Sequence, residues 1–268
     1  MRLVLTTVFD AGDAGAAEES VSFHVKAGVD LVLAAVRDEE VAVALQKLGD
    51  HVHVERSAGD GAGLRTGLAR RAVTEFGADW VISSGADEYW WPRGENLKEV
   101  LAPIPERYTI VQGLRRDFPA GETTRRSSPE DGGGAVLRPV FRADPDVSID
   151  ASGAIDLRRS VPLRAWYPIE VMYLGADGER QDESALVEDT RLRDALLAIR
   201  QGETSLVFRV PDIVEDARYA VECAAVGEVD LPRLERYVTE LEQRVERLEQ
   251  RFWPRVLRRV ARIAGRSS

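Results

Sequence analysis

Two neighbouring carboxylates follow a short apolar segment of the chain. Residues 80–82, Trp-Val-Ile, have the length and β-branched character of a buried strand, and Asp87 and Glu88 follow after a polar turn. In open α/β sheets, ligands bind in the crevice outside the carboxyl ends of the strands. Trp90 and Trp91 come next, which indicates a walled pocket. The alternative is a solvated acidic turn after a strand.

A glycine-rich stretch before residue 67 offers a second candidate site. Backbone N–H groups at a helix N-terminus bind anions, and Asp60 and Arg65 lie in or beside this turn. The stretch is neither a Walker A motif nor Gly-x-Gly-x-x-Gly, because its last spacing is wrong and no Lys-Ser/Thr follows. A plain loop before a helix is the alternative.

Other chemistry has less support. His51 and His53 would share one face of a strand, a spacing that can chelate a metal, but no third ligand is evident. The sequence has no Gly-x-Ser-x-Gly elbow, and its one cysteine, Cys223, lies in a helical pattern. Hydrolysis through a side-chain nucleophile therefore has no support.

The elements that must position these residues alternate between strand and helix. Strands are expected over residues 3–8, 30–36, 51–55 and 80–84, and helices over about 16–27, 38–48 and 63–76. This alternation predicts right-handed βαβ units and a mostly parallel sheet. The loops that follow the strands would then surround one crevice, as in a nucleotide-binding half domain.

Segment 86–92, Ala-Asp-Glu-Tyr-Trp-Trp-Pro, after these strand–helix units, resembles the metal-binding segment of family-2-like glycosyltransferases of the GT-A fold. The resemblance covers residues 1–120 best. In that family an Asp-x-Asp triplet at a strand end holds a divalent metal, which holds the diphosphate of a nucleotide-sugar. The resemblance implies an α/β, GT-A-type, Rossmann-like fold with a mostly parallel sheet and flanking helices.

The resemblance also implies a donor site and a metal site. Mg²⁺ or Mn²⁺ takes one or two carboxylates together with substrate phosphates, and the expected metal ligands are Asp87 and Glu88. Glu88 could instead support Asp87 or point elsewhere. The expected contacts to the nucleotide-sugar donor are Thr7, Asp10, Asp60, Arg65, Asp87 and Trp90.

Three positions depart from the family pattern. Gly85 replaces the first Asp of the triplet, the second strand ends in Ala34-Ala35, and Val161 stands where a histidine tends to precede Pro-Leu-Arg. Fewer charged ligands weaken metal binding. The two hypotheses are therefore a divergent glycosyltransferase, of the hexosyl or a related type, and a catalytically degenerate relative that binds sugar nucleotides or glycans.

An active enzyme would also need a base. Asp117 follows a predicted strand over residues 108–114 and is the candidate that deprotonates the acceptor hydroxyl. The acceptor itself, a glycan or a lipid-linked molecule, is not encoded in a readable motif. A salt-bridged surface carboxylate is the alternative for Asp117.

The rest of the chain predicts three regions. Residues 1–175 would form the GT-A-like domain, including a short helix at 97–101, a surface loop at 119–134 and a strand at 135–142. Residues 176–229 would be a helical region that completes or packs on this domain, with helices at 192–200 and 211–226. Residues 230–268 would form a heptad helix and a basic tail.

The last region predicts association. Apolar residues from Leu231 to Phe252 follow a 3-4 spacing, which fits a helical hairpin on the same chain or a coiled-coil homodimer. Residues 251–268 hold six arginines and no acid, so this amphipathic stretch could lie on an anionic membrane as a peripheral contact or be solvated.

Charge and hydropathy bound the remaining function classes. The formal net charge of the 268 residues is −10, so the body repels nucleic acid and we expect no nucleic-acid partner. No apolar run approaches about 18 residues. One cysteine suits a reducing compartment. The expected location is therefore cytoplasmic, with the inner membrane surface as an additional peripheral site.

Overall fold

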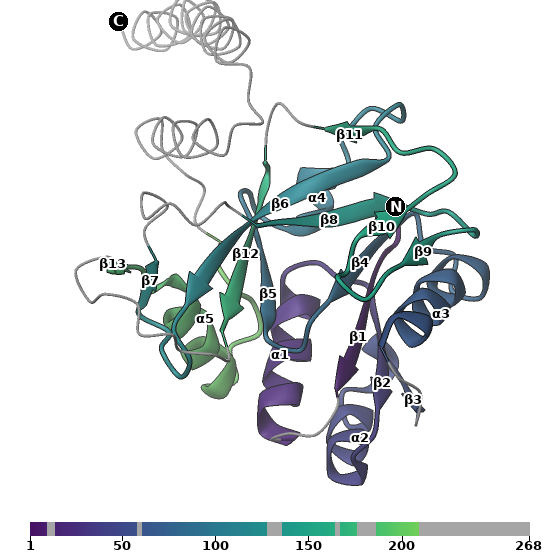
Figure 1. The fold of residues 1–268 in the computed structure, drawn as a ribbon. Coiled ribbons are helices and arrows are strands. Elements are labelled where there is room, and N and C mark those ends of the chain that lie inside the picture. Colours follow the sequence, from purple (N-terminus) through teal and green to yellow (C-terminus); the bar gives the residue numbers. More distant parts are fainter. Residues whose placement is uncertain (10–13, 58–60, 128–135, 164–166, 176–185, 209–268) are drawn as a thin grey trace, which may run out of the picture.

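The structure, a computed structural model, describes residues 1–9, 14–57, 61–127, 136–163, 167–175 and 186–208. Within these ranges it is an α/β fold with a mostly parallel central sheet (Figure 1). The predicted α/β class with flanking helices is thus confirmed. None of the described helices has both the length and the apolar character needed to cross a bilayer.

The central sheet has nine strands. Eight of them lie in the order β3 (Val52–Arg56), β2 (Leu31–Val36), β1 (Leu3–Phe9), β4 (Trp80–Ser84), β8 (Leu137–Arg142), β6 (Ile110–Phe118), β12 (Ile169–Leu174) and β5 (Glu88–Pro92), and β11 (Pro162–Leu163) pairs with β6. Only β8 and β5 run antiparallel to their neighbours. The carboxyl ends of the other strands therefore share one edge, called here the carboxyl edge, and their amino ends form the opposite amino edge.

Helices cover both faces of the sheet. On one face a core forms beneath α1 (Ala14–Lys26), α2 (Glu39–Gln46), α4 (Leu97–Leu101) and α5 (Arg191–Arg200). On the other face α3 (Gly61–Thr74) packs with the hairpin of β9 (Ser148–Ile149) and β10 (Ile155–Asp156). Figure 1 shows α1 and α3 on opposite sides of β1. Leu3 and Leu5 face the first core and Val4 faces the second, which explains why this strand is apolar throughout.

Local signals set the element boundaries. The Asp38 carboxylate caps α2 by accepting a hydrogen bond from the Glu40 amide at 2.7 Å. Gly28 follows α1 at φ +104°, a conformation that side-chain-bearing residues rarely adopt. Asn96 caps α4 by accepting a hydrogen bond from the Glu99 amide at 2.9 Å.

Two sequence predictions need correction. The segment after the predicted strand at 80–84 was expected to be a loop, but only residues 85–87 turn, because residues 88–92 pair with β12 as a sheet strand. The predicted loop at 119–134 contains β7 (Arg125–Ser127), which pairs with β13 (Leu186–Glu188). The predicted helix at 211–226, Cys223, the heptad helix and the basic tail lie outside the described residues.

Candidate functional site

The acidic turn lies at the carboxyl edge of the sheet. It joins the end of β4 to the start of β5, so Asp87 and Glu88 stand beside the ends of the parallel strands, as predicted from the order of strands. The Glu88 amide donates a hydrogen bond to the Gly85 carbonyl at 3.4 Å, and the Gly85 amide donates to Glu88 Oε2 at 2.8 Å. Two opposed hydrogen bonds therefore close the turn.

The Asp87 carboxylate folds back over Gly85. A Cβ added at Gly85 would lie 2.5 Å from Asp87 Oδ1, closer than real Cβ atoms approach other heavy atoms. Asp87 itself is half-buried, and its carbonyl accepts a hydrogen bond from the Leu174 amide at 3.0 Å. The turn is therefore attached to β12. The absence of a side chain at Gly85 leaves space for the Asp87 carboxylate.

Glu88 has a partner within the chain. Its side chain is only 3% exposed, and Oε1 lies 2.5 Å from Arg138 Nε on β8 in an ion pair that lacks hydrogen-bond geometry. Its other carboxylate oxygen accepts the Gly85 amide. The arrangement fits the alternative in which Glu88 supports the turn and leaves Asp87 to face a ligand.

Trp90 contacts the end of β4, directly before the same turn. Its side chain is fully buried, and its indole N–H donates a hydrogen bond to Ser84 Oγ at 2.9 Å. Its backbone amide donates to His24 Nε2 at 3.3 Å. In this arrangement Trp90 supports the turn. Its buried ring offers no surface against which the nucleobase of a donor could stack.

Asp117 stands on the other side of β12 from the turn. In register, Asp117 of β6 lies opposite Tyr173 of β12, which lies opposite Glu88 of β5. Arg115 donates to both Asp117 carboxylate oxygens, at 2.5 and 3.1 Å, and its guanidinium lies 4.2 Å from the centre of the Tyr173 ring. The structure thus places Asp87 and Asp117 on either side of the carboxyl end of one strand.

Two arginines extend this edge towards α3. Arg65 belongs to the first turns of α3, and a Cβ added at Gly153 would lie 3.9 Å from its Nη1 and 3.6 Å from Arg138 Nη1. The β9–β10 hairpin therefore brings both guanidinium groups to one place. Arg65 was expected from the sequence, whereas Arg138 was not, because it follows the predicted surface loop at 119–134 and has no motif around it.

Thr7 is the remaining predicted donor contact that the structure describes. It lies opposite Ser84 near the end of β1, and its hydroxyl is buried without a hydrogen-bond partner among the described residues. Burial of an unsatisfied hydroxyl is costly, which is consistent with a polar group supplied from outside those residues. Asp10 and Asp60 lie outside the described residues.

Val161 does not belong to this edge. Its carbonyl accepts a hydrogen bond from the Thr109 amide at 2.9 Å, at the start of β6. Val161 therefore lies beside the first residue of β6, Ile110, whereas Asp117 lies near the other end of this strand, roughly 20 Å away. A histidine at position 161 would therefore lie at the amino edge, away from Asp87.

The residues at the carboxyl edge fit a metal only in one mode. Within the described ranges, no group of three or more His, Cys, Asp or Glu side chains is arranged to hold a metal ion. Mg²⁺, however, is commonly bound through one or two carboxylates with water and substrate phosphates as the other ligands. Asp87, whose carboxylate has no ion pair among the described residues, suits that mode, and Arg65 and Arg138 lie at the same edge of the sheet.

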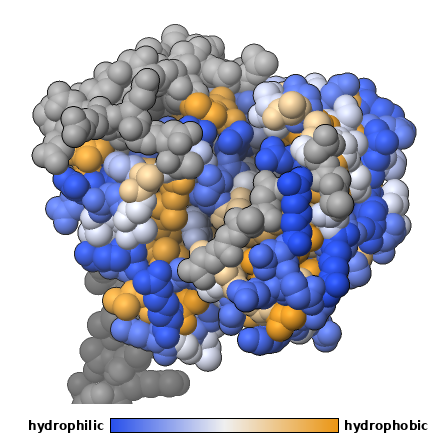
Figure 2. Space-filling view, turned by 60° about the horizontal axis from the view of Figure 1, so that its bottom comes forward, coloured by the Kyte–Doolittle hydropathy of each residue, from blue (hydrophilic) through white to orange (hydrophobic). Residues whose placement is uncertain are grey.

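Figure 2 is turned so that the lower side of Figure 1, towards which β1 runs, comes forward. Hydrophilic side chains make up much of the surface in this view.

Comparisons with known proteins yield distant similarities only. No family model and no curated protein matches the chain. Solved structures do match the chain, and three of them are the following. A nucleotidyl transferase from Methanothermobacter thermautotroptrophicus is 16% identical at a TM-score of 0.30, covering 53% of this chain and 72% of its own. A mannose-1-phosphate geranyltransferase from Thermus thermophilus has the same identity and TM-score, covering 53% and 50%.

The third structure is a CMP:2-keto-3-deoxy-manno-octonic acid synthetase complexed with CTP. It is 15% identical at a TM-score of 0.32, and the match covers 91% of this chain and 99% of the synthetase.

Proposed function

We propose that the protein transfers a sugar from a nucleotide-sugar to a glycan or lipid-linked acceptor, as a GT-A-type glycosyltransferase. One observation supports this proposal above the others. Asp87 and Asp117 flank the carboxyl end of β12 at the edge where α/β sheets bind ligands. In this arrangement Asp87 can contact a metal–diphosphate group, and Asp117 can contact an acceptor once Arg115 releases it.

In this proposal Asp87 is the protein ligand of Mn²⁺ or Mg²⁺, and Arg65 and Arg138 contact the donor diphosphate. The metal offsets the charge that builds on the leaving diphosphate. Glu88 holds Arg138 and the Gly85 amide, so it sets the geometry of the turn. Its role is support, and Asp87 carries the contact to the ligand.

Asp117 is the proposed base. It accepts the proton of the acceptor hydroxyl while the acceptor oxygen bonds to the anomeric carbon and the bond from that carbon to the diphosphate breaks. Arg115 now occupies both carboxylate oxygens of Asp117. Asp117 therefore becomes available only when Arg115 turns away, and the donor phosphates offer Arg115 a second anionic partner.

The first experiment measures thermal unfolding with UDP-, GDP- and dTDP-sugars, each with and without Mn²⁺. We expect one nucleotide-sugar to raise the Tm only when Mn²⁺ is present. Asp87→Asn should remove that increase, because it takes away the proposed metal-binding charge. Asp50→Asn, which removes an exposed charge at the amino end of β3, should leave it intact. An Mn²⁺-dependent increase that persists in Asp87→Asn contradicts the assignment.

A second function is favoured by the ion pairs of the site. Glu88 is paired with Arg138 and Asp117 with Arg115, so two of the three carboxylates at this edge are occupied. A catalytically degenerate relative that binds sugar nucleotides or glycans would have this arrangement. It predicts a Tm increase without Mn²⁺, together with no release of nucleoside diphosphate from any nucleotide-sugar.

A further inference from the structure

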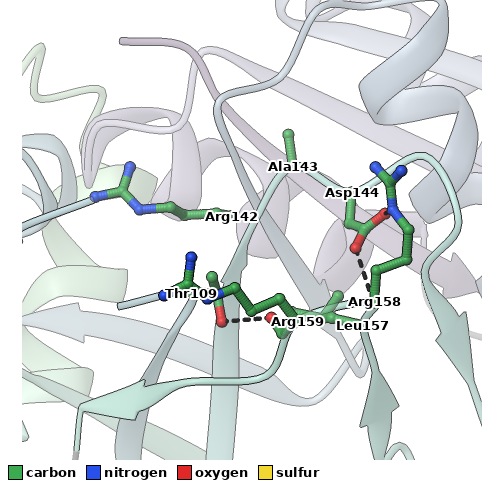
Figure 3. A pocket seen from close by; sticks show the side chains of 7 residues that line it. All are labelled: Thr109, Arg142, Ala143, Asp144, Leu157, Arg158 and Arg159. Carbon is green, nitrogen blue, oxygen red and sulfur yellow. Dashed lines mark hydrogen bonds and ion pairs between the residues drawn. The ribbon is translucent and has the colours of Figure 1, made fainter. Parts of the chain in front are cut away.

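A pocket opens at the amino edge, away from the acidic turn (Figure 3). Its volume is about 350 Å³, and it lies where β6 begins and β8 ends. Its lining carries three arginines and one acid among Thr109, Arg142, Ala143, Asp144, Leu157, Arg158 and Arg159. The lining is therefore cationic in a protein whose formal net charge is −10.

Arg142 is fixed at the wall of this pocket. Its Nε donates a hydrogen bond to the Tyr108 carbonyl at 2.9 Å, and its Nη2 donates to the Ile104 carbonyl at 2.7 Å. Its guanidinium also stacks over Trp80, 4.3 Å from the ring centre. These partners are neutral, so they hold the guanidinium in place without cancelling its charge, and no described residue accepts a hydrogen bond from Nη1.

Arg158 differs from Arg142 because acids neutralise it. Its Nε lies 3.1 Å from Asp144 Oδ1 and 3.1 Å from Asp146 Oδ2. Asp144 in turn accepts hydrogen bonds from the backbone amides of Asp146 and Arg158, at 3.0 Å each. Asp144, the one acid in the lining, is therefore paired with Arg158 and does not neutralise the charge of Arg142 or Arg159.

Arg159 provides the free charge. Its carbonyl accepts a hydrogen bond from Thr109 Oγ1 at 2.8 Å, which anchors its backbone to the start of β6. Its side chain is exposed and has no ion pair in the part of the chain that the structure describes. Figure 3 shows the guanidinium groups of Arg142 and Arg159 on the same side of the view, with the Arg158–Asp144 pair on the other.

We propose that this pocket binds a phosphate group, either inorganic phosphate or a small phosphate monoester. Two guanidinium groups, one rigidly held and one free to adjust, match the oxygens of a dianion. A volume of about 350 Å³ admits a sugar phosphate and not only an ion. The site is separate from the proposed donor site, because the two lie at opposite edges of the sheet.

The test is isothermal titration calorimetry of the full chain with inorganic phosphate and, in a second arm, with a hexose 1-phosphate. Arg159→Gln should weaken binding about tenfold, the effect of losing one charge-assisted contact. Arg107→Gln is the control, because Arg107 is an exposed arginine at the same edge outside the lining, and it should change the Kd less than about twofold.

Equal affinity for both ligands supports a site for the phosphate group alone, and tighter binding of the hexose 1-phosphate supports a site for an organic ester. Absence of binding, or equal weakening by the two substitutions, overturns the proposal, since the second result reports bulk charge only. Arg159→Gln should keep any Mn²⁺-dependent Tm increase with a nucleotide-sugar, so failure here is distinguishable from failure of the proposed transferase function.

Discussion

The side chain of Asp87 and the absence of one at position 85 depend on each other. The Asp87 carboxylate occupies the space that a Cβ at residue 85 would take, 2.5 Å from Oδ1. The absence of a side chain at Gly85 therefore leaves the space that the Asp87 carboxylate occupies.

Gly85→Ala tests this dependence. The new methyl group meets the end of a movable side chain, so the carboxylate should rotate away at a cost of less than about 1 kcal/mol in unfolding free energy. If Asp87 binds the metal, its displacement should lower the affinity for Mn²⁺ in the presence of nucleotide by about 10- to 100-fold. Thermal unfolding without ligand and Mn²⁺ titration with nucleotide measure the two effects.

Ala86→Gly is the matched control, because Ala86 is the exposed neighbour in the same turn. It should leave Mn²⁺ affinity nearly unchanged. Unaltered Mn²⁺ affinity in Gly85→Ala would show that the direction of the Asp87 carboxylate does not matter for binding.

Sequence reasoning found the carboxylates of this site but not their partners. Asp87 and Asp117 could be predicted because an acidic residue at a strand end is a local pattern. Arg138 and Tyr173 could not, since they reach the site through pairing of β8 and β12 with strands distant in sequence. A local sequence pattern does not show which strands become neighbours. Arg138 reaches the site because β8 inserts antiparallel between β4 and β6.

At the scale of elements, His24 connects α1 to β5. Its Nδ1 donates to the Ser20 carbonyl at 2.7 Å, and its Nε2 accepts from the Trp90 amide at 3.3 Å, so the buried ring is neutral. Burial lowers the pKa of His24 from 6.5 to about 4, against the opposing effect of the Ser20 hydrogen bond.

We therefore expect the protein to lose stability as the pH falls from 7 to 5. The unfolded imidazole gains a proton below 6.5, whereas the folded one stays neutral until about 4, so protons favour the unfolded state between these values. The loss between pH 7 and 5 should be about 2 kcal/mol in unfolding free energy. Urea denaturation at a series of pH values measures it.

Two substitutions assign this pH dependence. His24→Gln should lower stability at pH 7 and flatten the decline towards pH 5, because the titrating group is gone. His51→Gln, at an exposed position, should leave the decline unchanged. An equally steep decline in His24→Gln would place its origin elsewhere.

Strong periodicity made most elements predictable, and pairing geometry limited the rest. The strands from β1 to β4 and the helices between them follow apolar runs and helical spacing in the sequence. Residues 88–92 were not predicted as a strand, because Glu-Tyr-Trp-Trp-Pro neither alternates between polar and apolar residues nor forms an aliphatic run. They become a strand because β12 pairs with them along one side and their side chains are buried.

At the scale of the whole molecule, a buried charge network joins distant parts of the chain. Glu170 on β12 contacts Arg116 Nε at 2.8 Å, Arg191 Nη1 at 2.7 Å and Arg93 Nη1 at 3.7 Å. Burial opposes ionisation, but Arg191 and Arg116 outweigh it and hold the pKa of Glu170 well below its usual range. Asp189 adds a second carboxylate to Arg191 at 2.7 Å. The network thus ties α5 and the end of β13 to the sheet.

Glu170→Gln should therefore destabilise the protein by about 3–5 kcal/mol, because it leaves buried guanidinium groups without their shared carboxylate. Chemical denaturation at pH 7 measures the change. Asp194→Asn serves as the control, since Asp194 is 57% exposed and pairs with Arg193 at the surface, and it should cost no more than about 1 kcal/mol. A similar, small effect of both substitutions would refute a stabilising role for the network.

Trp90 gives the molecule an internal optical reporter. Its indole is bonded to Ser84, the last residue before the acidic turn, and is shielded from solvent. Because tryptophan emission depends on the polarity around the indole, we expect a ligand that moves the turn to shift the emission of Trp90. The chain has five tryptophans, so Trp90→Phe identifies the part of the shift that comes from this ring.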